Sequence, residues 1–224
     1  IMQRRCRIMN FLSSLISLLF PFTCPECGKA LKEGDFWCDI CLRKNLNIHL
    51  INSSFNEYLD GCYTLSNYDK GIRRALIQLK YNNQKSRKKS IEYMVESFNY
   101  WDRFKKYKLV VPIPLSKQRL EERGYNQVDL IFKDVFKRKN FFYKSNLLIK
   151  KRNTKVQSKL RKKDRKENMK NVFIVNKRFN IKDKNILLLD DIYTSGATML
   201  YAAKALKKAG AKSVMGFVVS SGAI

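Results

Sequence analysis

The sequence predicts an α/β protein: a mostly parallel sheet covered by helices on both faces, preceded by a small cysteine-rich module. From Gly61 onward, short apolar runs alternate with segments whose apolar residues recur at helical spacing. The strand-length runs are continuously apolar, which is typical of parallel strands buried on both faces. Residues 21–45 lack this periodicity and are rich in Cys, Gly and Pro instead.

Ten elements follow in order along the chain. We expect strands at 62–68, 108–112, 147–149, 172–175, 186–189 and 214–219, and helices at 71–80, 90–104, 126–136 and 197–209, the last closed by Gly210. The 224 residues suffice for one core and a small appendage. The expected organisation is a tail with a short apolar helix (1–20), a four-cysteine module (21–50) and an α/β domain (51–224).

The charge of the chain is strongly positive. It has 46 Lys and Arg against 19 Asp and Glu, a formal net charge of +27. Such a surplus favours a polyanionic partner: nucleic acid, a phosphorylated ligand or an anionic membrane. Basic residues gather in 70–89 and 144–170, with Tyr81 inside the first segment and Phe141, Phe142 and Tyr143 directly before the second. These aromatic side chains could stack on bases, or they could belong to the core beneath a solvated charged surface.

The N-terminus resembles a signal peptide only in part. Arg4, Arg5 and Arg7 precede an apolar run at 11–20, but no small-residue cleavage site follows. The run is also shorter than the ~20 residues needed to span a bilayer. We expect a cytoplasmic protein with no transmembrane span, whose basic flank suits peripheral contact with the inner face of the membrane. Met9 is an alternative native start, with residues 1–8 as upstream read-through.

Four of the six cysteines form two C-x-x-C pairs. Cys24 and Cys27 are followed after ten residues by Cys38 and Cys41, a spacing that can supply four thiolates to one tetrahedral Zn²⁺. With every ligand position taken by Cys, we expect this zinc to be structural. The alternative is a dithiol redox pair. Cys62 is expected to be a buried thiol.

Residues 186–198 carry the most specific pattern of the chain. Four apolar residues, a strand, lead to Asp190 and Asp191, followed by the loop Tyr193 to Gly196 and the start of a helix at Ala197 and Thr198. Ligands of open α/β sheets bind at this end of a strand. The loop amides, the hydroxyls and the helix dipole all favour an anion there, and the two carboxylates suit ribose hydroxyls.

These 13 residues resemble, along their whole length, the phosphoribosyl pyrophosphate (PRPP) signature of type I phosphoribosyltransferases. Their surroundings are similar to those of the ComF family, the competence-associated phosphoribosyltransferase-like proteins. The further matching segments are the four-cysteine module after Phe20-Pro21, Val111 to Pro114, Arg123 to Gln127, and Lys151 to Thr154 with Gln157, Leu160, Arg165, Asn168 and Phe173.

The resemblance implies a division of labour within the site. Asp190 and Asp191 would hold the ribose hydroxyls of PRPP directly or through Mg²⁺, and the loop 194–198 would hold the 5-phosphate. Arg119 and Arg123 are candidates for the pyrophosphate because a guanidinium matches phosphate geometry, although Arg123-Gly124 also fits a helix terminator. Thr154, Gln157 and Arg165 would lie in a mobile hood over the substrate.

Three functions are compatible with these residues. The resemblance implies a PRPP-binding protein that assists uptake or handling of single-stranded DNA in natural transformation, together with other competence proteins. The alternatives are a metabolic phosphoribosyltransferase with no DNA role and a zinc-organised docking module with a vestigial site. No segment identifies an acceptor, so the sequence does not decide between turnover and binding alone.

Overall fold

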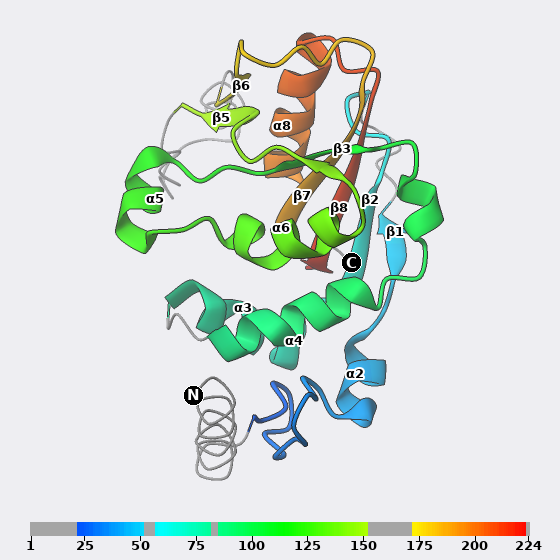
Figure 1. Cartoon of the computed structure of the whole chain (residues 1–224), viewed down its shortest axis with the longest axis vertical. Helices are drawn as coiled ribbons and strands as arrows, with labels where there is room; N and C mark the ends of the chain where they lie inside the picture. The colour runs from blue at the N-terminus through cyan, green and yellow to red at the C-terminus, as the bar shows by residue number, and fades with distance from the viewer. Residues whose placement is uncertain (1–21, 52–56, 82–84, 152–171, 223–224) are drawn as a thin grey trace, which may run out of the picture.

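The computed structural model describes residues 22–51, 57–81, 85–151 and 172–222, and a six-stranded sheet lies at its centre (Figure 1). The strand order is β1-β2-β8-β7-β3-β4. All neighbours pair in parallel except β1, which is antiparallel to β2, so the predicted mostly parallel sheet is confirmed. The strands are β1 (His49–Ile51), β2 (Cys62–Asn67), β3 (Leu109–Pro112), β4 (Phe142–Tyr143), β7 (Asn185–Tyr193) and β8 (Ser213–Ser221).

Helices cover both faces of this sheet. One face carries α3 (Lys70–Tyr81), α4 (Lys85–Glu96) and α6 (Gln127–Arg138), and the other carries α8 (Ala197–Lys208). A two-stranded sheet of β5 (Leu148–Lys150) and β6 (Phe173–Val175) packs beside α8. Alternate residues of β7 enter the two cores, Leu187 and Leu189 on the α3 side and Ile186 and Leu188 on the α8 side. This is why the strand is apolar throughout.

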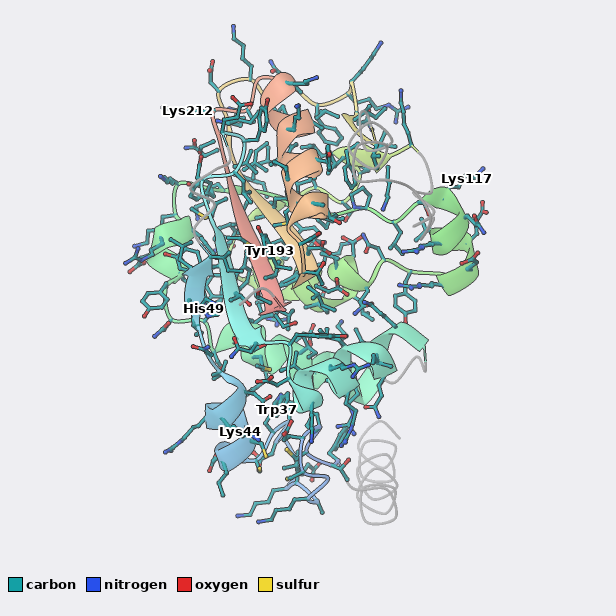
Figure 2. All side chains as sticks on the ribbon, turned by 180° about the vertical axis from the view of Figure 1, so that it is seen from behind. Trp37, Lys44, His49, Lys117, Tyr193 and Lys212 are labelled. Atoms are coloured by element: carbon teal, nitrogen blue, oxygen red, sulfur yellow. The ribbon has the colours of Figure 1, made fainter. Side chains whose placement is uncertain are left out.

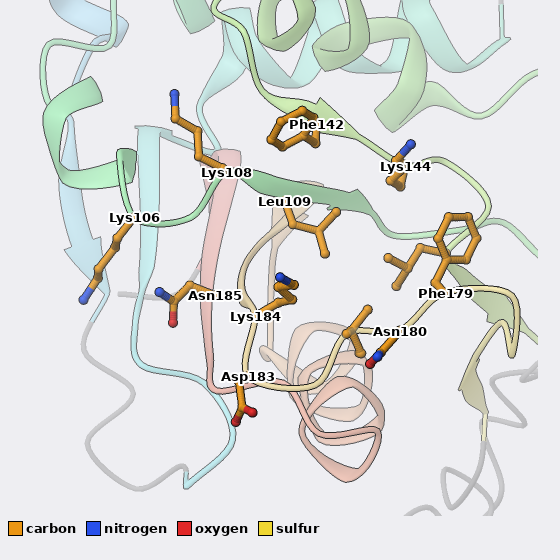
Figure 3. Close-up of a pocket in the computed structure, with 12 residues that line it drawn as sticks. Lys106, Lys108, Leu109, Phe142, Lys144, Phe179, Asn180, Asp183, Lys184 and Asn185 are labelled. Carbon is orange, nitrogen blue, oxygen red and sulfur yellow. The ribbon is translucent and has the colours of Figure 1, made fainter.

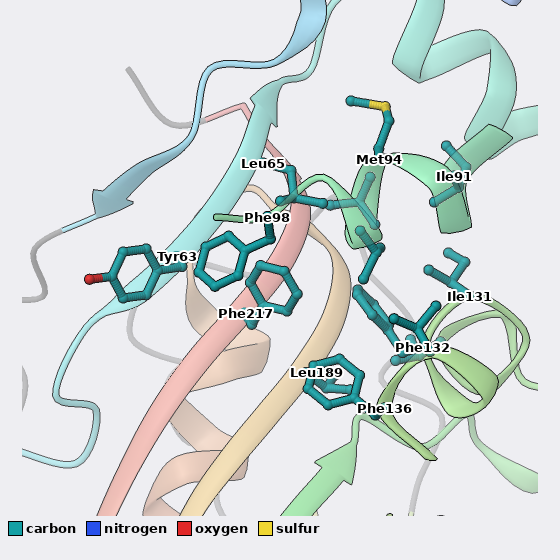
Figure 4. Packing of buried hydrophobic residues seen from close by; sticks show 14 of the residues in the cluster. Tyr63, Leu65, Ile91, Met94, Phe98, Ile131, Phe132, Phe136, Leu189 and Phe217 are labelled. Carbon is teal, nitrogen blue, oxygen red and sulfur yellow. The ribbon is translucent and has the colours of Figure 1, made fainter. Parts of the chain in front are cut away.

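An aromatic cluster corrects one predicted helix. The helix expected at 90–104 ends at Glu96, and a short 3₁₀ turn, η1 (Trp101–Phe104), follows. Phe98 stacks on Phe104 with ring centroids 4.9 Å apart, and it lies 4.9 Å from the ring of Phe217 (Figure 4). Residues six apart point about 120° away from each other on a helix. A continuous helix could not bring both rings onto the same strand.

Two short helices were not expected from the sequence. α2 (Asp39–Asn45) begins directly after Cys38, and α5 (Lys117–Arg123) follows β3. Gly124 caps α5 in the left-handed conformation, φ 75°, so Arg123-Gly124 is indeed a helix terminator. Gly210 follows α8 with φ 96°, consistent with the stop expected there.

Candidate functional site

The acidic pair lies at the open end of β7. This strand pairs with β8 as far as Tyr193, but its pairing with β3 stops at Leu189. Asp190 and Asp191 therefore follow the point where the pairing with β3 ends. The sequence placed them just after the strand; they are in fact part of it, because β8 continues alongside.

Asp190 is the buried member of the pair, 9% exposed. Burial, and then the negative charge of Asp191, raise the pKa of this carboxyl well above its usual range. One carboxylate oxygen accepts a hydrogen bond from the backbone amide of Asp191 at 2.9 Å. A buried carboxyl whose pKa is raised by burial and by a neighbouring acid is uncommon in a purely structural role, and such groups gather at functional sites.

Asp191 forms an ion pair with Lys80. The ammonium of Lys80, in the last turn of α3, lies 2.9 Å from a carboxylate oxygen, and both side chains are largely buried. In the sequence, Lys80 is only one of several lysines in a basic segment. No local signal could single it out, because its partner lies 111 positions further along the chain.

The loop after β7 offers exposed hydroxyls at the start of α8. Thr194 and Ser195 are exposed and Thr198 is partly buried. Gly196 caps α8 in the left-handed conformation, φ 71°, and no side chain caps the helix. A β-carbon at Gly196 would lie 2.2 Å from the hydroxyl oxygen of Tyr193, so only glycine fits beside this ring (Tyr193, Figure 2). The first backbone amides of α8 can therefore donate hydrogen bonds to a bound anion.

Basic side chains from two other elements lie near the acidic pair. Burial lowers the pKa of Lys150 on β5, the positive charge of Arg119 lowers it further, and the charge of Asp190 acts in the opposite direction. These electrostatic contacts connect α5, β5 and β7 in one region. Arg119 is exposed, whereas Arg123 is partly buried and makes contacts of its own. Like Lys80, Lys150 has no distinguishing signal in the sequence, where it is one lysine of a basic segment.

The four predicted cysteines meet in one cluster. The sulfur atoms of Cys24, Cys27, Cys38 and Cys41 all lie within 4.8 Å of one another, close enough to hold a metal ion. Burial raises the pKa of the Cys24 thiol, but hydrogen bonds from the backbone amides of Cys27, Cys38 and Glu26 bring it down to about 7. Burial raises the pKa of Cys41. The expected buried thiol at Cys62 is confirmed, 0% exposed and separate from this cluster.

Two arginines dock the cysteine module onto the helices of the main core. Arg87 of α4 donates to the carbonyl oxygen of Thr23 at 2.6 Å and to its hydroxyl at 3.1 Å. Arg74 of α3 donates to the carbonyl oxygens of Pro25 and Glu26 at 3.2 and 3.3 Å. The indole of Trp37 donates to the carbonyl oxygen of Ser90 at 2.9 Å. The cysteine pair Cys24–Cys27 is thus fixed to α3, the helix that carries Lys80.

Of the aromatic side chains considered for base stacking, some are buried and one is exposed. Phe141 packs between Trp101 and Phe136, and Tyr143 is largely buried, so both belong to the core. Phe142 is 65% exposed. The side chain of Tyr81, the hood candidates Thr154, Gln157 and Arg165, and most of the basic segment 144–170 lie outside the described residues, as does the apolar run 11–20. Among the helices that are described, none is long and apolar enough to cross a membrane.

Comparison with known proteins finds one matching domain model and several similar proteins. Residues 145–222 match the model of the phosphoribosyl transferase domain. Competence protein F of Haemophilus influenzae is 24% identical over 200 residues, 87% of this chain and 82% of that protein. Competence protein ComFC of Bacillus subtilis is 38% identical over 115 residues, 51% of this chain but only 45% of that protein. The DNA utilization protein YhgH of Escherichia coli is 24% identical over 201 residues, 85% of this chain and 80% of that protein.

Proposed function

Because the chain belongs to the ComF family, we propose that it binds Mg-PRPP at the acidic pair and assists the uptake or handling of single-stranded DNA in natural transformation. The observation that carries the first half is the acidic pair at the open end of β7, directly before an uncapped helix N-terminus. This arrangement offers carboxylates to a ribose and amides to its phosphate within one short segment.

Each residue of the site has a defined part in this proposal. Asp190 and Asp191 accept hydrogen bonds from the ribose hydroxyls, directly or through Mg²⁺. Lys80 forms an ion pair with Asp191. When a sugar hydroxyl or Mg²⁺ binds Asp191 instead, the ammonium of Lys80 is released and can bind a phosphate oxygen. The 5-phosphate contacts the loop and helix start formed by Tyr193, Thr194, Ser195, Gly196, Ala197 and Thr198, and the pyrophosphate contacts Arg119 and Arg123 with support from Lys150.

The same arrangement suits phosphoribosyl transfer. When pyrophosphate leaves C1 of the ribose, positive charge develops on the ring and negative charge on the leaving group. Asp190 and Asp191 would hold the ring in place, and Arg119 and Lys150 would stabilise the departing phosphates. Mg²⁺ supplies further neutralisation of the pyrophosphate when bound. The acceptor is undefined, and binding without turnover uses the same contacts.

The cysteine cluster holds structural Zn²⁺ in this proposal. Four thiolates complete a tetrahedral shell, so no position is open for a substrate or water. The metal would therefore stabilise the module that Arg74 and Arg87 attach to α3 and α4.

The DNA-related role rests on the relatives and on charge. Relatives are named for competence and for DNA utilization, and a net charge of +27 suits a nucleic acid. These observations favour this role over a metabolic phosphoribosyltransferase acting on a nucleobase. We place the protein in the cytoplasm, in peripheral contact with the inner face of the membrane and with other competence proteins.

Calorimetric titration of Mg-PRPP into the full chain tests the site. We expect saturable binding that weakens by at least about 100-fold in the Asp190→Asn/Asp191→Asn variant. The control is Asp35→Asn/Asp102→Asn, which removes two exposed carboxylates and should bind as the wild type does. Absence of wild-type binding would contradict the proposed PRPP site. Product formation with a free nucleobase and no affinity for DNA would support the metabolic alternative instead.

A further inference from the structure

A hollow lies at the other end of the sheet from the acidic pair, where β3 and β7 begin (Figure 3). Its volume is about 510 Å³, and Leu109 and Asn185, the first residues of these strands, line it together with Phe142 of β4. From Asn185 to Asp191 the strand β7 spans about 20 Å. The hollow is therefore separate from the acidic pair.

The rim of this hollow is basic. Lys106, Lys108, Lys144 and Lys184 line it against a single acid, Asp183, and all five side chains are exposed. Within the described part of the chain, none of these lysines forms an ion pair with a carboxylate. Lys106 and Lys108 lie over the rings of Tyr107 and Phe141, at 5.0 and 4.9 Å from the ring centroids, and keep their positive charge there. Several ammonium groups without a carboxylate partner around a concave surface concentrate the positive potential there. The ligand expected at such a surface is an anion.

An exposed aromatic ring stands among these lysines. Phe142 is 65% exposed, whereas its neighbours Phe141 and Tyr143 point into the core, because side chains alternate along the strand. Beneath it the hollow is apolar, with Leu147 and Ile181 at 0% and 2% exposure. The exposed face of this phenyl ring is open to stacking against a planar ligand.

We propose that this hollow binds single-stranded nucleic acid, with a base stacked on Phe142 and backbone phosphates paired with Lys108, Lys144 and Lys184. A basic surface with an exposed aromatic is the combination by which proteins bind single strands without reading sequence. A simple phosphate would use the lysines but not the ring, and the bases of a duplex are not free to stack on it. That the bound strand is DNA rests on the proposed function. The location of the surface rests only on the lysines and on Phe142.

Fluorescence anisotropy with a labelled 20-residue oligo(dT) tests this surface in the full chain. We expect Phe142→Ala to weaken binding about tenfold, the loss typical of one stacked base, and Phe142→Tyr to retain most of the affinity. In Lys108→Gln/Lys144→Gln, the slope of log affinity against log salt should become shallower by about 1.4, because two phosphate contacts are lost. The Mg-PRPP affinity of these variants should stay at the wild-type value, which also shows that they are folded.

The matched control is Lys133→Gln/Lys137→Gln, which removes two exposed lysines of α6 and the same charge. The proposal is wrong if this control loses as much affinity as the pocket pair, if Phe142→Ala binds as the wild type, or if duplex DNA binds as tightly as oligo(dT). Those outcomes leave the DNA-related function itself standing. A wild-type chain that binds neither oligo(dT) nor oligo(U) would overturn both the surface and that function, and oligo(U) binding alone would support the surface but assign it to RNA.

Discussion

The cysteine cluster and the acidic pair both depend on α3, but they are built in opposite ways. At the cluster, four sulfur atoms lie within 4.8 Å of one another, enough ligands to complete the tetrahedral shell of the proposed zinc ion. At the acidic pair, one lysine neutralises Asp191 and the adjoining loop residues Thr194 and Ser195 stay exposed. A site whose ligands are all supplied by the protein stabilises the fold. A site whose polar groups still lack partners can gain favourable interactions when a ligand binds. The variants below test this difference.

The largest effect is expected at the closed cluster. Cys24→Ser removes one of four thiolates, and structural zinc in such small modules is worth on the order of 10 kcal/mol. We expect zinc content to fall from one per chain to near zero, and the module to become sensitive to protease. Cys62→Ala is the control, because this buried cysteine lies outside the cluster. Full zinc content in Cys24→Ser would show that the ligand assignment is wrong.

The docking of the module should produce the next largest effect. Arg87→Ala loses hydrogen bonds to Thr23 and to the side-chain oxygen of Gln78, at 2.7 Å, and should weaken the attachment by about 3 kcal/mol. Zinc transfer to a coloured chelator should then become faster. Arg138→Ala, which removes an exposed ion pair with Glu96, should leave that rate unchanged. Equal rates in the two variants would mean that the module holds its metal without help from α4.

A smaller effect is expected in the loop of the open site. Gly196→Ala combines left-handed backbone with contact against the Tyr193 hydroxyl, and should reduce the free energy of unfolding by about 2 kcal/mol. Gly124→Ala has nearly the same φ, 75°, with no atom within 4 Å of the added carbon. Denaturant unfolding of both variants separates the two causes. If they lose the same stability, the tyrosine contact is unimportant.

The smallest effect should have the opposite sign. Because burial raises the pKa of Asp190, its ionised form destabilises the folded state at pH values above the ordinary range of a carboxyl. Asp190→Asn should therefore stabilise the protein by on the order of 1 kcal/mol near neutral pH, while weakening Mg-PRPP binding. The gain in stability should disappear at low pH, where Asp190 of the wild type is protonated in both the folded and the unfolded state. A loss of stability at neutral pH would indicate that this carboxylate has a structural role.

The sequence predicted the parts of the fold that depend on local pattern. Apolar runs such as Ile186–Leu189 identified the central strands, because a strand between two cores must be apolar on both sides. The same reasoning extended one helix through Phe98, where helical spacing persists by coincidence. There, contacts with Phe217, more than a hundred residues away, decide the backbone.

The candidate sites show the same limit. Cys24, Cys27, Cys38 and Cys41 could be assigned because two short motifs carry the ligands. Lys80 could not, since a lysine within a basic segment has no distinguishing neighbour and meets Asp191 only through the packing of α3 on the sheet. Phe142 was grouped with Phe141 and Tyr143, and only strand β4 shows that it faces the opposite way.

The position of α3 links the cysteine cluster to the acidic pair. Arg74 contacts the backbone beside Cys24 and Cys27, and Lys80, six residues later and about 9 Å further along the helix, contacts Asp191. Gly71 of the same helix lies so close to Glu26 that a β-carbon would collide with it. A chain that has not acquired its metal would hold the first turns of α3 less firmly, and Lys80 with them. On the function proposed above, loss of the zinc would therefore weaken the binding of the sugar phosphate as well as the folding of the cysteine module.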